Sequence, residues 1–266
     1  MNGREKQIFD LLCEHGDLSI QRLSQLLEVS PSSVRRDLNE MSEHRFIQRT
    51  HGGATLSNVV SYNPLPIHKP PVLVAEARAI AHQALQLIER GDVIGMSGGR
   101  ICTELALHMR LLEGITVVTN AVNIAAELVA LPGIQVMLTG GNLDPRSFEL
   151  IGKAPAMVLE GVRLHKFFVG ADGITVEHGL TNHSEAVALV AREFIKHSDQ
   201  TILLADSSKF TRSNLTKVAD VSEISTIVTS DYTSSAVIQQ FETAGIQCQV
   251  AKCARAHREK SHVTPH

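Results

Sequence analysis

The feature that most constrains this chain is a pair of short apolar-periodic segments near its start, separated by a tight turn. Residues 19–27 predict one helix, and an earlier helix over about 2–15 offers apolar residues to the same small core. Ser30 and Pro31 predict the start of another helix, because Ser is a strong N-cap and Pro suits the first helical position. This arrangement is typical of a helix-turn-helix whose second helix lies in a DNA groove.

The second helix of this pair separates an apolar stripe from a polar surface. Val34, Leu38 and Met41 recur at spacings of three to four residues and form the stripe. The remaining surface carries Arg, Asn and Ser side chains. Arg can pair with guanine, Asn with adenine, and Ser can contact phosphate or base. An Arg-Arg dipeptide alone is more often a solvated face, so the prediction rests on the cap, the spacing and the segment that follows.

That following segment, residues 46–56, has two short extended runs around Gly52-Gly53. Glycine tolerates positive φ, so the pattern predicts a tight hairpin and, with the helices, a winged helix-turn-helix over 1–57. Arg45 could also bring this wing to a phosphate backbone. The alternative is a small structural core with solvated arginines. The candidate DNA-binding residues are Ser19, Ser30, Ser32, Ser33, Arg35, Arg36, Asn39, Arg49 and His51.

Charge does not make this chain a general nucleic-acid binder. The formal net charge is −3, and residues 1–56 contain seven Lys or Arg against eight Asp or Glu. Binding of double-stranded DNA therefore depends on the placement of individual arginines. A homo-oligomer, either a dimer or a tetramer, would present more than one such face to paired half-sites of an operator.

The head resembles the DNA-binding signature of DeoR-family bacterial transcriptional regulators. The resemblance rests on Arg4-x3-Ile8-x3-Leu12, on Ser30-x2-Ser33-Val34-Arg35-Arg36-Asp37-Leu38, and on His51-Gly52-Gly53-Ala54. The family usually has Thr where this chain has Ser33. That difference keeps the hydroxyl and removes a methyl group that could contact thymine.

The rest of the chain predicts a linker, a second domain and a tail. Residues 58–73 contain four prolines and predict an extended linker. Strand-like and helical stretches then alternate over 74–251, which predicts a larger Rossmann-like α/β domain with a mostly parallel sheet. Residues 252–266 are basic and lack an apolar period, so we expect a disordered tail, with accessory DNA affinity as the alternative.

Polar residues and glycines follow several of the expected strands. In parallel sheets ligands collect beyond the carboxyl ends of the strands, where glycine N–H groups and helix N-termini can bind an anion. A single Gly-Gly after a strand is usually only a turn, so the prediction rests on several such ends converging. The candidate effector-binding residues are Ser97, Gly98, Gly99, Arg100, Thr119, Asn120, Gly140, Gly141, Asp172, Glu185, Asp206 and Lys209. For Glu185 a helix-end charge is the alternative.

This second domain resembles the sensor domain of the same regulators. The matching segments are residues 76–81, Thr119-Asn120, Gly140-Gly141, residues 170–173, residues 179–181 and residues 206–210. The resemblance implies a fold like that of sugar-phosphate isomerases and a phosphorylated sugar or related metabolite as effector. Where the family commonly has Asp-Ser-Gly-Thr-Thr, this chain has Ser97-Gly98-Gly99-Arg100-Ile101. Arg100 could clamp a phosphate, form a structural ion pair, or serve an unusual anion.

Together these patterns predict a ligand-responsive, sequence-specific DNA-binding regulator, most simply a repressor. The alternative is a sugar-phosphate isomerase or deaminase with a DNA-binding head, but no nucleophile–base pair is legible, so we do not expect an enzyme. The four cysteines lack Cys-x-x-Cys spacing and the histidines lack His-Glu-x-x-His spacing, so neither a metal nor another cofactor is expected. A polar start without a signal peptide, and the lack of a long apolar run, predict a cytoplasmic protein without membrane contact.

Overall fold

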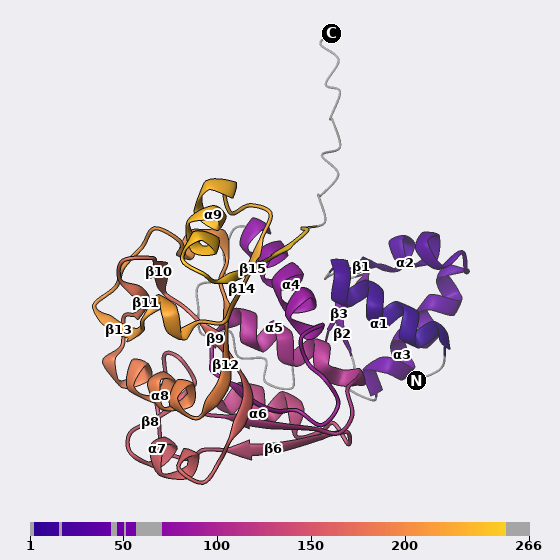
Figure 1. Cartoon of the computed structure of the whole chain (residues 1–266). Coiled ribbons are helices and arrows are strands. Elements are labelled where there is room, and N and C mark those ends of the chain that lie inside the picture. The colour runs from indigo at the N-terminus through magenta and orange to yellow at the C-terminus, as the bar shows by residue number, and fades with distance from the viewer. Residues whose placement is uncertain (1–2, 16–17, 44–46, 51, 57–70, 254–266) are drawn as a thin grey trace.

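The computed structural model describes residues 3–15, 18–43, 47–50, 52–56 and 71–253 (Figure 1). The first part is a small helical head with a hairpin. Its elements are α1 (Gly3–His15), β1 (Leu18–Ser19), α2 (Ile20–Leu27), α3 (Pro31–Glu43), β2 (Ile47–Thr50) and β3 (Gly53–Leu56). The three helices pack around a buried cluster that includes Ile8, Leu23 and Leu38. The predicted winged helix-turn-helix is confirmed, with the order α1, α2, α3 and then the β2–β3 hairpin.

The wing is a three-stranded antiparallel sheet in the order β1-β3-β2. Thr50 pairs with Gly53, so two residues connect β2 to β3, and Gly52 has a φ of 96° that favours glycine. Gly53 is needed for a different reason. A Cβ added there would lie 2.1 Å from the carbonyl oxygen of Leu18, on the short strand β1 that the sequence did not predict. His51 and residues 44–46 lie outside the described residues.

The second part is a larger α/β domain, the sensor domain. Its first half comprises α4 (Pro71–Leu85), β4 (Val93–Met96), α5 (Arg100–His108), the 3-10 turn η1 (Met109–Leu111), β5 (Ile115–Thr119), α6 (Val122–Leu128), β6 (Ile134–Leu138), β7 (Asn142–Leu143), β8 (Leu150–Ile151) and α7 (Ala154–Leu159). Its second half comprises β9 (Leu164–Gly170), β10 (Gly173–Thr175), β11 (Gly179–Asn182), α8 (Glu185–Lys196), β12 (Ser198–Leu204), η2 (Ser207–Lys209), β13 (Thr216–Ala219), η3 (Val221–Glu223), β14 (Thr226–Ser230), α9 (Ser235–Thr243) and β15 (Gln247–Ala251).

Seven strands form the central sheet in the order β15-β14-β12-β9-β4-β5-β6, and every neighbouring pair is parallel. The expected α/β fold with a mostly parallel sheet is therefore confirmed. Two smaller antiparallel units were not anticipated: the sheet β10-β11-β13 and the pair β7–β8. Both come from short segments without a clear apolar period, so local pattern gave no sign of them.

The folded sensor domain extends a few residues into both the expected linker and the expected tail. Helix α4 begins at Pro71, so residues 71–73 form its first turn, where a proline at the start costs no hydrogen bond. Residues 58–70 of the expected linker lie outside the described residues. At the other boundary Cys253 is buried, and its backbone N–H donates to Oδ1 of Asp231 at 3.1 Å. Residues 254–266 are not described.

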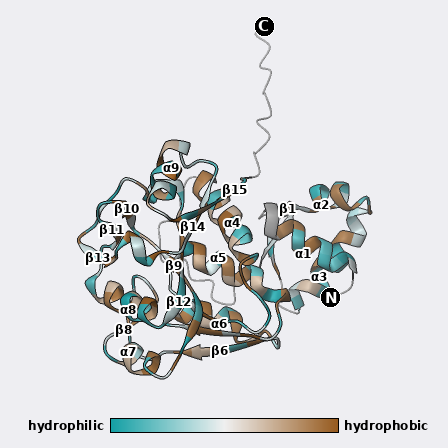
Figure 2. Ribbon diagram, in the orientation of Figure 1, coloured by the Kyte–Doolittle hydropathy of each residue, from teal (hydrophilic) through white to brown (hydrophobic). Residues whose placement is uncertain are grey.

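Helices cover both faces of the central sheet, which makes three layers. One apolar cluster joins α4, α5 and α6 to one face, and the other joins α7, α8 and α9 to the opposite face. Consecutive strand residues alternate between the clusters, as Phe167 and Phe168 do on β9. In Figure 2 the helices around the sheet change between brown and teal along their length, as expected when one side of each helix packs against the strands.

The strand order reverses between β4 and β9. From β4 the chain proceeds through β5 to β6 in one direction, whereas β9, β12, β14 and β15 extend in the other. Ligands of open α/β sheets bind beyond the carboxyl ends of the strands at such a reversal. Ser97 and Gly98 follow β4 at this point, and Gly170 ends β9. The fold therefore places part of the predicted effector site where a ligand site is expected.

The head contacts the sensor domain through α1. Figure 1 shows the head beside α4 and α5. The guanidinium carbon of Arg110, in η1, lies 5.7 Å from the centroid of the Phe9 ring on α1, a cation–π distance. Nη2 of Arg110 also lies 3.3 Å from Oε2 of Glu127 on α6. Across the described residues, no helix has the length and apolar character needed to span a bilayer.

Candidate functional site

The polar face of α3 is exposed, as the DNA-binding prediction requires. Val34 and Leu38 are buried in the head, whereas Ser32, Arg35, Arg36 and Asn39 point away from that core and are exposed. Their spacing produces this separation, because residues three and four apart share one side of a helix. The two adjacent arginines offer rigid donor forks that suit guanine and phosphate.

A serine cluster begins this helix. Oγ of Ser30 accepts a hydrogen bond from the backbone N–H of Ser33 at 3.2 Å, so Ser30 is the cap that the sequence predicts. The Ser30 hydroxyl also lies 2.8 Å from that of Ser32 and 3.0 Å from that of Ser33. Ser19 has a similar role on α2, where its Oγ accepts from the N–H of Arg22 at 3.1 Å. These hydroxyls stand at the N-termini of both helices, where phosphate oxygens can also bind.

The wing is tied to α3. Nη1 of Arg49 on β2 donates a hydrogen bond to Oδ1 of Asn39 on α3. The two residues were predicted to contact phosphate and base separately, and the structure brings them together. This bond holds the hairpin at a fixed place beside α3, so that the helix and the wing form one surface.

An ion pair between a buried carboxylate and a partly exposed arginine, which sequence reasoning missed, fixes α3 against α1. The carboxylate of Asp37 is 2% exposed and accepts two hydrogen bonds from Arg4, from Nε at 2.5 Å and from Nη2 at 2.8 Å. Both residues belong to the motif quoted for the family resemblance, but neither was assigned a role. The signal was an acidic residue at a position that falls on the apolar side of the helix.

In the sensor domain, the loop of residues 97–100 lies at the reversal between β4 and β9. The backbone N–H of Gly170 donates to Oγ of Ser97 at 3.2 Å, which joins the loop to the end of β9. Gly99 precedes α5 with a φ of 102°, and no side chain in the described part of the protein caps this helix. The first N–H groups of α5 therefore have no side-chain acceptor at this end.

The carboxylate of Glu149 occupies the same place, although no motif or spacing in the sequence pointed to this residue. Its Oε1 accepts hydrogen bonds from the N–H of Gly98 at 3.0 Å and from Nδ2 of Asn120 at 3.3 Å. Glu149 is buried, and burial is the largest influence that raises the pKa of its carboxyl group above the ordinary value of 4.5. It comes from the connection between β7 and β8, the antiparallel pair that local pattern did not predict.

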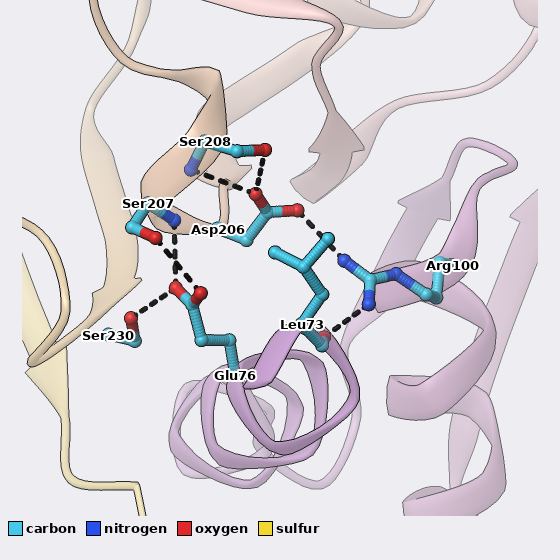
Figure 3. A network of polar contacts seen from close by, with 7 residues as sticks. All are labelled: Leu73, Glu76, Arg100, Asp206, Ser207, Ser208 and Ser230. Carbon is cyan, nitrogen blue, oxygen red and sulfur yellow. Dashed lines mark hydrogen bonds and ion pairs between the residues drawn. The ribbon is translucent and has the colours of Figure 1, made fainter. Parts of the chain in front are cut away.

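Arg100 forms an ion pair within the protein, one of the alternatives that the sequence left open. Its Nη2 lies 2.9 Å from Oδ2 of Asp206, and its Nη1 donates to the carbonyl oxygen of Leu73 on α4 (Figure 3). Oδ1 of Asp206 accepts from the N–H of Ser208 at 3.0 Å and from its hydroxyl at 2.5 Å. In this structure Asp206 therefore supports the loop after β12 and holds the Arg100 side chain.

Glu76 on α4 binds the same loop, and it is a functional residue that sequence reasoning missed. Its carboxylate is fully buried and accepts hydrogen bonds from the N–H and hydroxyl of Ser207, at 2.8 and 2.9 Å. It also accepts from the hydroxyl of Ser230, the last residue of β14, at 2.5 Å (Figure 3). The network thus connects α4 to two strand ends.

The remaining predicted residues are dispersed. Thr119 is fully buried, with its hydroxyl donating to the Met96 carbonyl at 2.7 Å, so it joins β5 to β4 rather than facing a ligand. Asp172 accepts from the N–H of His183 at 3.1 Å, and Glu185 is an exposed residue in the first turn of α8. Lys209 is half-buried at the end of η2.

Gly140 and Gly141 follow β6, two strands away from the reversal. Both have positive φ, and a Cβ at Gly141 would lie 2.6 Å from the carbonyl oxygen of Ile151 on β8. The close approach of β8 therefore explains why this position needs a glycine, without any role in ligand binding. No group of three or more His, Cys, Asp or Glu side chains within the described ranges could hold a metal ion. Burial raises the pKa of the Cys102 thiol to about 12, so this thiol stays protonated beside the loop.

Two family models match the chain. The DeoR-like helix-turn-helix domain matches residues 4–59, and the DeoR C terminal sensor domain matches residues 74–231. Among solved structures, ribose 5 phosphate isomerase A from Neisseria gonorrhoeae is similar, with 17% identity, coverage of 52% of this chain and 54% of that chain, and a TM-score of 0.40. A likeness at this level says nothing about the chemistry of the chain.

Two curated relatives extend over nearly all of the chain. A putative aga operon transcriptional repressor from Escherichia coli is 29% identical over 92% of this chain and 91% of its own length. An uncharacterized HTH-type transcriptional regulator, FruR, from Bacillus subtilis is 31% identical over 86% of this chain and 90% of its own length. With the winged head and the α/β sensor domain, these matches assign the protein: it belongs to the DeoR family of transcriptional regulators.

Proposed function

We propose that this protein is a cytoplasmic transcriptional repressor whose affinity for a double-stranded DNA operator falls when a phosphorylated sugar or related metabolite binds to the sensor domain. The exposed side chains of α3 supply the DNA-reading surface, and Arg49 supports the wing beside it. The name of the Escherichia coli relative supports the direction of control. Because the head carries little net charge, we propose that a dimer or tetramer binds paired half-sites.

One observation carries the coupling between the two domains. Helix α5 begins at the loop of residues 97–100 and continues directly into η1, which contacts the head. Arg100 stands at one end of this segment, and Arg110, over the Phe9 ring, stands near the other. A helix packed in a core moves as a body rather than deforming. A ligand that changes the partners of Arg100 can therefore shift η1 against α1.

This route gives the allosteric proposal its two sites and its connecting element. In the state described here, Arg100 is held by Asp206 and by the carbonyl of Leu73 in the first turn of α4. A ligand group that accepts hydrogen bonds near the start of α5, such as a hydroxyl oxygen, would compete for the Arg100 guanidinium. Loss of the bond to Leu73 would also release the first turn of α4, the helix that follows directly on residues 57–70 between the domains.

We propose no catalytic role for the sensor domain. The isomerase or deaminase alternative needs a carboxylate base at a sugar carbonyl, and Asp172 was the candidate. Its carboxylate accepts the N–H of His183 and thereby positions the residues before α8. Turnover of any sugar phosphate by the purified protein, abolished by Asp172→Asn, would contradict this view.

The test begins with a thermal-shift screen of sugars and sugar phosphates, because a ligand of the folded state raises its apparent stability by mass action. Each stabilising compound is then added to the protein bound to a fluorescent operator found by selection from random duplexes. We expect at least one compound to lower the operator affinity. If none of the stabilising compounds changes it, the proposed control by a ligand is wrong.

A further inference from the structure

Around the loop of residues 97–100, the hydrogen-bond donors of Gly98 and Arg100 have partners within the described part of the protein, whereas two buried acceptors have none there. The N–H of Gly98 is bonded to Glu149, and the Arg100 guanidinium is bonded to Asp206 and to Leu73. By contrast, the side-chain oxygens of Asn120 and Asn123 are buried and have no hydrogen-bond partner among the residues that the structure describes. Native proteins seldom leave such groups unpaired, so these two oxygens point to a missing ligand.

The orientation of both amides follows from their neighbours. Nδ2 of Asn120 faces two acceptors, Oε1 of Glu149 at 3.3 Å and the carbonyl oxygen of Leu150 at 3.2 Å. A flipped amide would place its oxygen against both of them, which is unfavourable. Nδ2 of Asn123 donates at 2.9 Å to the Thr103 hydroxyl, whose own proton goes to the carbonyl of Gly99. The two free amide oxygens are therefore fixed as acceptors.

Glu149 supplies a third acceptor, and it stands where an anion would bind. Its side chain packs directly on the loop, because a Cβ added at Gly98 would lie 2.6 Å from Cγ and 2.7 Å from the carboxyl carbon of Glu149. The uncapped start of α5 attracts negative charge, and the Glu149 carboxylate brings that charge from within the chain. A phosphate at this loop would meet a buried carboxylate at the position it needs.

We propose that Glu149 is a specificity-determining residue whose carboxylate reserves the loop of residues 97–100 for ligand hydroxyl groups and keeps phosphate out. The inference rests on the proposed function, since it concerns the end of the effector that meets this loop. Hydroxyl groups can donate to Glu149 and to the free oxygens of Asn120 and Asn123, whereas a phosphate offers mainly acceptors. A phosphorylated effector would then carry its phosphate at its other end, away from this loop.

The test uses inorganic phosphate as the probe and requires neither an identified effector nor DNA. Phosphate is titrated into the full-length wild type, Glu149→Gln and Glu149→Ala, with thermal stability and the amide signals of ¹⁵N-glycine-labelled protein as readouts. We expect the wild type to show no shift of the Gly98 and Gly99 amides. In both variants these signals should shift, with the Kd for phosphate lower by about ten-fold or more.

Asp144→Asn is the matched control. Asp144 lies in the same connection between β7 and β8, and its carboxylate accepts the N–H of Arg146 rather than a group of the loop. This variant removes one negative charge nearby but leaves Glu149 in place, so phosphate binding should stay as in the wild type. Glu149→Gln preserves the size of the side chain and an acceptor for Gly98, so the test does not depend on the alanine variant folding.

Three outcomes would overturn the inference: wild-type loop amides that shift with phosphate as strongly as those of the variants, variants that gain no phosphate binding, or an equal gain in Asp144→Asn. The operator experiment is separate. If phosphate binds as expected but no compound releases DNA, the proposed function fails while the role of Glu149 stands. If a compound releases DNA but the variants gain nothing, only the role of Glu149 fails.

Discussion

The exposed polar surface of α3 and the strand ends of the sensor domain differ in how their polar groups are used. Arg35 and Arg36 are exposed on α3, and their side chains bond to no other described residue. At the strand ends, by contrast, Gly98 is bonded to Glu149 and Arg100 to Asp206. These two arginines can therefore meet a partner without breaking an internal hydrogen bond. A ligand that bonds to Gly98 or Arg100 has to replace an internal hydrogen bond, and that exchange can change the structure.

The largest expected effect tests whether the strand-end network is structural. Glu76→Ala removes the acceptor shared by the N–H and hydroxyl of Ser207 and by the hydroxyl of Ser230. Leaving these donors unpaired should lower the stability of the sensor domain by about 2–4 kcal/mol. Thermal unfolding of the full chain measures this change, with Glu160→Ala, an exposed residue after α7, as the control. Equal unfolding midpoints for Glu76→Ala and Glu160→Ala would show that the strand-end network does not stabilise the sensor domain, so the proposed difference from the head would be wrong.

The next effect concerns the head. Arg35→Ala or Arg36→Ala should leave the unfolding midpoint unchanged, because both side chains are exposed and neither has a partner among the described residues. A variant that loses a bidentate base contact should bind the operator more weakly by about 1–3 kcal/mol. Fluorescence anisotropy at several salt concentrations measures this loss and separates base from phosphate contacts. Arg163→Ala, an exposed arginine of the sensor domain paired with Asp199, is the control. Wild-type affinity in both α3 variants would remove the proposed recognition helix.

A smaller effect depends on pH. Burial raises the pKa of Glu149 in the folded state, so ionisation of this group opposes folding once the pH exceeds its folded pKa. Glu149→Gln should therefore be more stable than the wild type at neutral pH, by about 1–2 kcal/mol. The difference should shrink as the pH falls toward the ordinary carboxyl value, because the wild-type group then becomes neutral.

The measurement is the unfolding midpoint of both proteins across that pH range. Two neighbouring groups do not confuse this comparison. Asp144, which also raises the pKa of Glu149, is present in both proteins, and the buried Cys102 thiol stays protonated throughout the pH range. A difference that is constant with pH would show that the carboxylate charge is not the cause.

The same contrast explains what could be predicted from the sequence. Ser30, Pro31 and the apolar spacing specify α3 within a few residues, so its exposed face could be read directly. The parallel sheet followed from the alternation of strands and helices. The partners within the site depend on which strand ends meet, and on a short antiparallel pair that brings Glu149 to Gly98 across 51 positions of sequence. Local periodicity contains no information about such a contact.

The claim that α5 couples the two domains can be tested most directly with Phe9→Leu. This variant keeps an apolar side chain in the head but removes the ring beneath Arg110. Operator affinity is measured with and without a compound from the screen, and Phe241→Leu, in the opposite helix layer, is the control. The account predicts that Phe9→Leu retains DNA binding and ligand binding but weakens the effect of one on the other. A ligand effect of wild-type size in Phe9→Leu would contradict it.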